Sequence, residues 1–235
     1  MTDYAFEPAP TTSLAIQGEE ARFPVRRILC VGRNYAAHAA EMGGDASKEP
    51  PFFFTKPADA AFSAGVEDEA VAPYPSLTKN LHHEAELVVC IGTGGRDIDA
   101  SNALDHVFGY AAGVDLTRRD LQNEAKETRR PWDWSKGFDH SAPIGPIGRR
   151  EVATDFDPTQ GFIRLSVNDE VRQDADLSEQ IWGVADTIAF ASRGIELRPG
   201  DLIMTGTPAG VGALEKGDLV RCQIKGLPDL VVTIG

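Results

Sequence analysis

Cysteine is scarce in this chain of 235 residues. Its three cysteines, Cys30, Cys90 and Cys222, each lie inside an apolar run, and no Cys-x-x-Cys pair occurs. An odd number of cysteines without paired spacing argues against a disulfide framework and a structural zinc site, and it is typical of a reducing compartment. We therefore expect three small core residues and a cytoplasmic location.

Long apolar runs and basic runs are also missing. No run approaches the roughly 18 apolar residues of a membrane span, and no basic region followed by an apolar one opens the chain. No basic run offsets the formal net charge of −13. This balance excludes nucleic acid and membrane as expected partners. An anionic substrate would need a local cationic pocket or a metal ion, because the overall field repels it.

The composition is otherwise that of an ordinary globular protein with many turns, since it includes 23 Gly and 15 Pro. Short strand-like runs outnumber helical patterns, which predicts a β-rich α+β domain and not a βαβ parallel sheet. We expect residues 1–24 to form an N-terminal arm, with one strand at 12–16 on the surface, and residues 25–235 to form a single domain. Strands are expected at 27–32, 52–56, 84–92, 107–115 and 162–168, with a hairpin of 219–224 and 230–234.

Helices are expected in fewer places. The pattern predicts a short helix within 33–44 with a glycine exit, a helix over 101–106 capped by Ser101, and a loop with a short helix in 117–130. An amphipathic helix is expected over 178–192, with Ile181, Val184, Ala185, Ile188 and Ala189 on one face.

Two glutamates at the start of one apolar run are the first sign of a functional site. Glu84 and Glu86 lead into Leu-Val-Val-Cys-Ile-Gly. Side chains of a strand alternate between its faces, so both carboxylates would point the same way from the end of a buried strand. A hard divalent cation would relieve their repulsion. The alternative is a polar strand end in solvent, because so short a motif often occurs by accident.

A third acid, Asp115, ends the strand-like run 107–115. Three carboxylates from two strand ends form an oxygen-lined site typical of Mg²⁺ or Mn²⁺. Asp115 alone could instead cap the segment that follows it. His82 and His83 flank the acids, but imidazole suits Mg²⁺ less well than carboxylate does, so we expect neither to be a ligand.

Six motifs, read together, resemble the fumarylacetoacetate hydrolase family from residue 27 to the end. They are Gly32-Arg33-Asn34-Tyr35-x-x-His38-x-x-Glu41, Phe54-x-Lys56-Pro57, Glu84-x-Glu86-Leu87, Asp115-x-Thr117-x-Arg119-Asp120-x-Gln122, Lys136-x-Phe138-Asp139 and Thr205-Gly206-Thr207-Pro208-x-Gly210-Val211-Gly212. Within the family, several segments look most like the fumarylpyruvate hydrolases of gentisate-type aromatic degradation. The resemblance implies a β-sandwich roll with few short helices, a homodimer, and Mg²⁺ or Mn²⁺ held by Glu84, Glu86 and Asp115.

The chemistry of a 2,4-dioxo acid suggests roles for three further residues. Hydrolysis needs water to add at the distal carbonyl and a pyruvate enolate to leave. His38, oriented by Glu41, is the expected general base, and Lys136 is expected to stabilise the oxyanion or take part in the later protonation. The alternatives are a surface histidine on an Ala-rich helix and a solvated lysine.

Substrate-binding residues are expected in two segments. Gly206 and Thr207 would hold the substrate's carboxylate, because a Gly-rich turn exposes N–H donors, although a simple turn is the alternative. Arg33, Arg119 and Gln122 are expected to contact the substrate or to support residues that do. Arg119 could instead pair with a surface acid.

The sequence therefore predicts a hydrolase that cleaves the C–C bond of acylpyruvates, with fumarylpyruvate and water giving fumarate and pyruvate. Its substrate would be a small dicarboxylic oxo-acid. An oxaloacetate decarboxylase is the alternative, because the same metal-assisted enolate chemistry serves decarboxylation. A non-catalytic metal-binding or anion-binding domain is a third hypothesis, and it leaves the His38–Glu41 pair unexplained.

Overall fold

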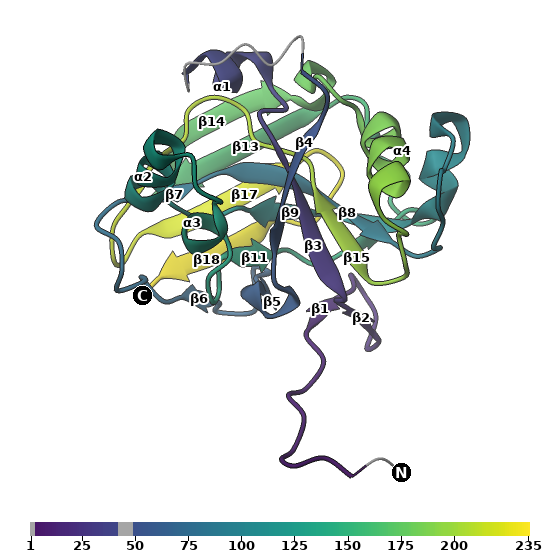
Figure 1. Ribbon diagram of the computed structural model, residues 1–235, viewed down its shortest axis with the longest axis horizontal. Coiled ribbons are helices and arrows are strands. Elements are labelled where there is room, and N and C mark those ends of the chain that lie inside the picture. The colour runs from purple at the N-terminus through teal and green to yellow at the C-terminus, as the bar shows by residue number, and fades with distance from the viewer. Residues whose placement is uncertain (1–2, 42–48) are drawn as a thin grey trace.

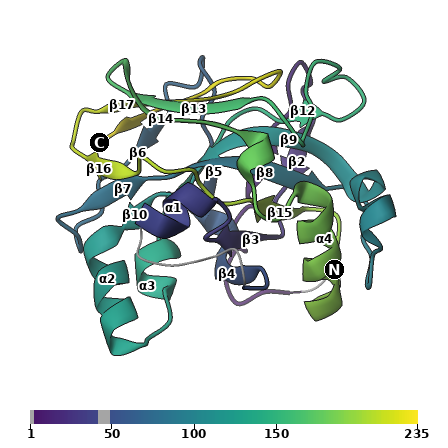
Figure 2. The same ribbon diagram turned by 90° about the horizontal axis from the view of Figure 1, so that it is seen from above.

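The computed structural model describes residues 3–41 and 49–235 of the chain. Two large β-sheets pack face to face, and short helices lie around them (Figures 1 and 2). The β-rich sandwich roll expected from the sequence is confirmed.

An eight-stranded sheet forms the centre of the molecule. Its strands are β3 (Arg27–Gly32), β4 (Phe52–Lys56), β5 (Ala61–Ser63), β8 (Ala85–Ile91), β9 (Val107–Val114), β11 (Ala142–Ile144), β12 (Gly148–Arg149) and β15 (Asp201–Met204). All seven residues of β8 are buried. Leu87 and Val89 face one core, whereas Val88 and Cys90 face a second core on the opposite side of the sheet. A strand covered on both faces reads as a continuous apolar run, which explains the sequence after Glu86.

A five-stranded sheet covers one face of the central sheet. It consists of β6 (Val71–Ala72), β13 (Phe162–Val167), β14 (Glu170–Asp176), β17 (Leu219–Ile224) and β18 (Leu230–Ile234). Ile163 and Leu165 of β13 point into the shared core, whereas Arg164 between them points outward. This period of two is the pattern of a half-buried strand. β17 and β18 pair antiparallel, so the predicted C-terminal hairpin is confirmed.

Two small sheets complete the strands. One contains β7 (Leu81–His83), β10 (Thr117–Arg118) and β16 (Gly212–Leu214), and the other contains β1 (Ser13–Ala15) and β2 (Arg22–Pro24). Leu14 is fully buried and Phe23 nearly so, both in the second core. The segment 1–24, expected as a surface arm, therefore contributes to the core from residue 13 onward, while residues 3–12 extend away from the sheets (Figure 1).

The helices are short. They are α1 (Ala36–Glu41), α2 (Arg119–Thr128), α3 (Asp133–Lys136) and α4 (Val184–Gly194), with 3₁₀ turns at Ala58–Ala60, Ala100–His106 and Leu177–Glu179. Figure 2 shows α2 and α3 together on one side of β4 and α4 on the other. The end of the helix predicted within 33–44, including its glycine exit, lies outside the described residues. None of the described helices has the length and apolar character to cross a membrane.

Two helix predictions need correction. Ser101 was expected as a cap but lies inside the 3₁₀ helix, whose extended preceding residue is Asp99. The helix expected over 178–192 is interrupted before Val184. The N–H groups of Ile181 and Trp182 donate to the backbone and side-chain oxygens of Asn34 at 2.8 Å each. These bonds replace helical ones, so Ile181 does not share the α4 face.

The cysteine prediction is confirmed. Cys30, Cys90 and Cys222 are buried, and each carries a free thiol.

Candidate active site

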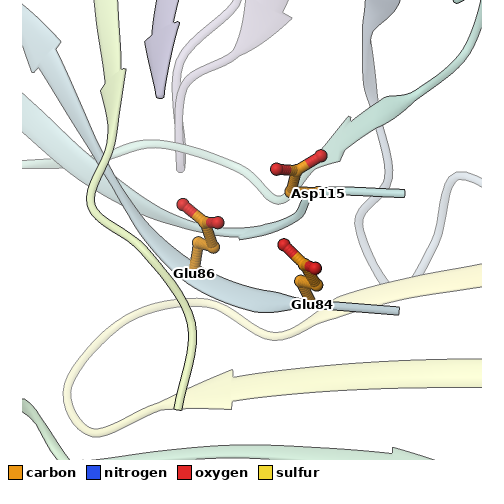
Figure 3. A group of neighbouring side chains, drawn as sticks. All are labelled: Glu84, Glu86 and Asp115. Atoms are coloured by element: carbon orange, nitrogen blue, oxygen red, sulfur yellow. The ribbon is translucent and has the colours of Figure 1, made fainter. Parts of the chain in front are cut away.

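Three carboxylates meet where β8 begins and β9 ends. Ala85 pairs with Val114 across the antiparallel strands, and the Asp115 N–H donates to the Glu84 carbonyl oxygen at 2.8 Å. This register places Asp115 beside Glu84 and Glu86. Each residue offers an oxygen within 4.8 Å of the others, and all three are buried. Figure 3 shows the carboxyl groups of the three residues turned toward a common space.

Lys136 and Arg119 neutralise much of this negative charge. The Lys136 ammonium donates to Glu84 Oε2 and Asp115 Oδ2 at 2.7 Å each and to Thr117 Oγ1 at 2.6 Å. The Arg119 guanidinium donates to Glu84 Oε1. All three protons of Lys136 are therefore used, and the predicted oxyanion role would require one of these bonds to open. Arg119 therefore pairs with the buried Glu84, and the alternative that it pairs with a surface acid is wrong.

Lys56 lies next to Asp115 of the acidic cluster. Its side chain is fully buried, and its ammonium is 2.9 Å from Asp115 Oδ1. Its hydrogens bond elsewhere: to the backbone oxygens of Leu116 and Lys136 and to Ser141 Oγ at 3.0 Å. In the fold Lys56 is therefore a third cation against three acids.

The electrostatic balance differs among the acids. Burial would raise the pKa of Glu84, but Lys136 and Arg119 outweigh it and hold that pKa well below its usual range. Burial raises the pKa of Glu86 well above its usual range, and repulsion from Asp115 and Glu84 adds to the effect. Burial opposes the charge on Lys136, yet Asp115 and Glu84 raise its pKa. Lys136 therefore remains an ammonium ion, and Glu86 is the acid that most needs a further cation.

The cluster fits a divalent metal ion, as the sequence predicts. Asp115 Oδ1 is buried and accepts no hydrogen bond from the described residues, although the Lys56 ammonium lies 2.9 Å away. A buried carboxylate oxygen with free lone pairs can accept a further cation. A hard ion such as Mg²⁺ or Mn²⁺ takes carboxylate oxygens, and it would also relieve the repulsion on Glu86.

His38 projects from α1 into the pocket that Glu84 and Glu86 line. It is buried, and its ring lines the same pocket as Glu84, Glu86 and Lys136. His38 Nδ1 lies 3.2 Å from Glu41 Oε2. A carboxylate at Nδ1 holds a proton there and leaves Nε2 as a proton acceptor. The surface alternative for His38 is therefore excluded, and the arrangement suits a general base.

The turn from Gly206 to Gly212 forms another wall. The Gly206 N–H donates to Glu86 Oε2 at 2.7 Å. The backbone of Gly206 has a φ of +92°, which glycine adopts readily and other residues adopt only at a cost. Thr207 is buried and lines the pocket. The Gly210 N–H lies 3.4 Å from Glu41 Oε1, so the turn also contacts the partner of His38.

The pocket has a cationic outer wall that sequence reasoning found only in part. Arg119, Gln122 and Lys126 lie on one face of α2 and line the pocket, and Arg33 lines it from the turn before α1. Gln122 accepts a hydrogen bond from Arg119. Lys126 was missed, and its spacing of four residues after Gln122 was the available signal.

Lys126 is an unusual lysine. Its ammonium lies 5.5 Å from the ring centroid of Trp132, and within the described part of the chain no carboxylate forms an ion pair with it. Burial and the neighbouring cations Arg119 and Arg33 together lower its pKa to about 8, against the opposing effect of Glu84. An ammonium ion at a pocket wall that pairs with no carboxylate of residues 3–41 and 49–235 is available to an anionic ligand.

The fold and the acidic cluster define a known class of proteins. Residues 27–235 match the family model described as fumarylacetoacetate (FAA) hydrolase C-terminal. The chain therefore belongs to the fumarylacetoacetate hydrolase family, as its motifs predict.

Individual relatives give a finer comparison than the family model. The crystal structure of fumarylpyruvate hydrolase from Pseudomonas aeruginosa in complex with Mn²⁺ and pyruvate superposes with a TM-score of 0.95, at 50% identity over 99% of both chains. A mitochondrial oxaloacetate decarboxylase of Dictyostelium discoideum is 39% identical over 202 residues, which are 86% of this chain and 90% of that protein. A mitochondrial oxaloacetate tautomerase of Homo sapiens is 37% identical over 209 residues, 89% of this chain and 91% of that protein.

Proposed function

We propose that this protein is a divalent-metal-dependent hydrolase of acylpyruvates, with fumarylpyruvate as its substrate and fumarate and pyruvate as products. The observation that carries the proposal is His38, held by Glu41, in one pocket with Glu84 and Glu86 of the acidic cluster. Binding alone needs no general base beside a metal site. Similarity to a fumarylpyruvate hydrolase at 50% identity supports the same substrate.

Glu84, Glu86 and Asp115 would hold Mg²⁺ or Mn²⁺, and the bound ion would supply Lewis-acid stabilisation to negative charge on the pyruvate portion. Lys136 and Arg119 position Glu84 for this task. Thr207 lines the pocket and would bind the pyruvate carboxylate, whereas the expected Gly206 N–H is already bonded to Glu86.

His38 Nε2 accepts a proton from water as the water oxygen bonds to the distal carbonyl carbon. The C–C bond between that carbon and the pyruvate methylene then breaks, and its electron pair remains with the pyruvate portion. A proton returned to this methylene carbon completes pyruvate, so one water molecule is consumed. His38 carries the proton taken from water, which makes it a suitable source for this step.

The outer wall supports a substrate with a second carboxylate. Lys126 and Arg33 line the pocket, and the Lys126 ammonium has no carboxylate partner in the described residues. We assign Lys126 to the carboxylate at the far end of the acyl group. An acylpyruvate without that carboxylate would gain nothing from this wall.

The test is turnover by the purified protein loaded with Mn²⁺ or Mg²⁺. Pyruvate released from fumarylpyruvate, measured by a coupled assay, is the expected result, and chelation of the metal should stop it. Failure to hydrolyse any member of an acylpyruvate panel would contradict the proposal.

Oxaloacetate decarboxylation is the second candidate function. It is favoured by 39% identity to an oxaloacetate decarboxylase, and the same metal-assisted charge stabilisation would serve it. Homodimer formation and the single-domain boundary at residue 25 remain predictions.

A further inference from the structure

A buried glutamine of the five-stranded sheet contacts Thr207, a residue of the pocket wall. Gln173 is the one buried residue among the first five of β14, and 1% of its surface is exposed. The Gly206–Gly212 turn rests on the strand at this point, because a Cβ atom at Gly210 would clash with the Arg172 carbonyl oxygen. The close approach brings Thr207 and Gln173 into contact.

The orientation of the Gln173 amide follows from its backbone partners. The Ala85 N–H can only donate, and it lies 3.0 Å from Gln173 Oε1. The Pro208 carbonyl oxygen can only accept, and it lies 2.9 Å from Nε2. A flipped amide would place donor against donor and acceptor against acceptor, so the assignment is fixed.

All four hydrogen-bonding positions of this amide are occupied. Oε1 also meets His83 Nδ1 at 3.0 Å, and because Oε1 only accepts, His83 Nδ1 must carry a proton. The second hydrogen of Nε2 points to Thr207 Oγ1 at 2.7 Å. Gln173 therefore donates to the hydroxyl of Thr207 and cannot accept from it.

This direction decides where the Thr207 proton goes. A hydroxyl has one proton to donate, and Gln173 has occupied one of its acceptor positions. No acceptor among residues 3–41 and 49–235 receives the proton, and Thr207 lines the pocket with Glu86 and His38. The proton is free to point toward a bound ligand.

We propose that Gln173 is a positioning residue that fixes Thr207 as a hydrogen-bond donor to the carboxylate of the pyruvate portion of the substrate. The proposal rests on the proposed function, because that function places the carboxylate at Thr207. Gln173 itself never touches the substrate. It acts by removing the alternative in which the hydroxyl donates into the protein and presents a lone pair to an anion.

Replacing the donor group of the Gln173 amide with an acceptor tests the proposal. In Gln173→Glu, one carboxylate oxygen can still accept from Ala85 and His83, while the other loses the bond to the Pro208 carbonyl oxygen, accepts the Thr207 proton and turns it away from the pocket. The probe is pyruvate, and its dissociation constant for the Mn²⁺-loaded protein is measured by calorimetry. We expect Gln173→Glu to weaken pyruvate binding by about 10-fold or more, the effect of losing one hydrogen bond to a charged group.

A double-mutant cycle separates positioning from a general structural effect. Thr207→Val removes the hydroxyl, so adding Gln173→Glu to that variant should weaken pyruvate binding little further. Thr207→Ser keeps a hydroxyl and should retain the sensitivity to Gln173→Glu. Equal losses with and without the hydroxyl would overturn the proposal, because Gln173 would then act by packing alone.

A measurement on the unaltered protein covers the case in which Gln173→Glu does not fold. Nitrogen NMR reports which ring nitrogen of His83 is protonated. A proton on Nδ1 is expected, and a proton on Nε2 alone would contradict the amide orientation and hence the proposal. Failure of the proposed function is distinguishable, since it would appear as absent acylpyruvate turnover, whereas failure here appears in the cycle or in the tautomer.

Discussion

The ammonium of Lys56 lies 2.9 Å from Oδ1 of Asp115, and both side chains are fully buried. The hydrogens of Lys56 are directed to other oxygens, so the pair is held by charge and not by a hydrogen bond. Lys56 thus stabilises Asp115 by its charge and leaves the free lone pairs of Oδ1 for a metal cation.

Loss of Lys56 should therefore destabilise the metal-free protein most. Removing one partner of a buried ion pair costs about 3 to 5 kcal/mol, because the other charge stays buried and unpaired. We expect Lys56→Met to lose this much unfolding free energy in chelator and less in Mn²⁺, which would supply positive charge at the same acid. Denaturant unfolding under both conditions measures the difference. The exposed Lys79→Met is the control, and an equal loss of stability under both conditions would mean that Lys56 contributes packing only.

Glu86 should be necessary for metal binding. Glu86→Gln keeps an oxygen for the Gly206 N–H but removes the charge. Mn²⁺ affinity should fall by more than the roughly 10- to 100-fold that loss of an outer partner causes. Titration followed by the electron paramagnetic signal of free Mn²⁺ measures this, with Glu124→Gln on the exposed side of α2 as the control. Unchanged affinity in Glu86→Gln would show that the Glu86 carboxylate is not a metal ligand.

His38 should distinguish the two candidate reactions. Hydrolysis needs a base for water and decarboxylation does not, so His38→Ala should lower kcat for fumarylpyruvate by about 100- to 10,000-fold. Any decarboxylation of oxaloacetate should change much less. Rates with both substrates, each at saturating metal, give the comparison. Equal losses would remove the assignment of His38 as a water-activating base.

Lys126 should decide the preference for a second carboxylate. Lys126→Met should raise KM for fumarylpyruvate and leave KM for acetylpyruvate, which lacks the distal carboxylate, nearly unchanged. Steady-state kinetics with the two substrates tests this directly. A parallel rise for both would show that Lys126 supports the pocket without reading the distal group.

The pH dependence of the same residue gives an independent check. Burial lowers the pKa of Lys126 to about 8, so the side chain is charged below this pH and loses its charge above it. KM for fumarylpyruvate should therefore rise between about pH 8 and pH 9.5, while Lys136, whose pKa is raised, stays charged. Lys126→Arg should keep KM low across this range, because arginine does not deprotonate there. A rise that persists in Lys126→Arg would assign the titration to another group.

The parts of the fold that could be predicted depend on local patterns. The apolar run of β8 and the alternation of β17 and β18 each follow from which faces are covered, and both were predicted. The interruption before α4 could not be predicted, because it is caused by Asn34, which lies 148 residues from Trp182 in the chain. A sequence window around Ile181 contains no sign of that partner.

The site residues also divide into those that the local sequence predicts and those that it does not. Glu84, Glu86 and Asp115 occupy strand ends whose sequence already pairs acid with core. Lys56 resembles a surface lysine at the end of an aromatic strand, and its burial depends on the pairing of β4 with β3. Gln173 stands in an otherwise exposed polar strand, so its role depends on how the two sheets pack.

The Gly206–Gly212 turn limits how this enzyme can be changed. Within seven residues it contacts Glu86 of the acidic cluster, the His38 partner Glu41, and Gln173 of the five-stranded sheet. A substitution here would disturb several contacts together, so few variants of the turn will be tolerated. The wall formed by α2, where Lys126 pairs with no carboxylate of the described residues, is the region in which a library should seek altered acyl-group selectivity.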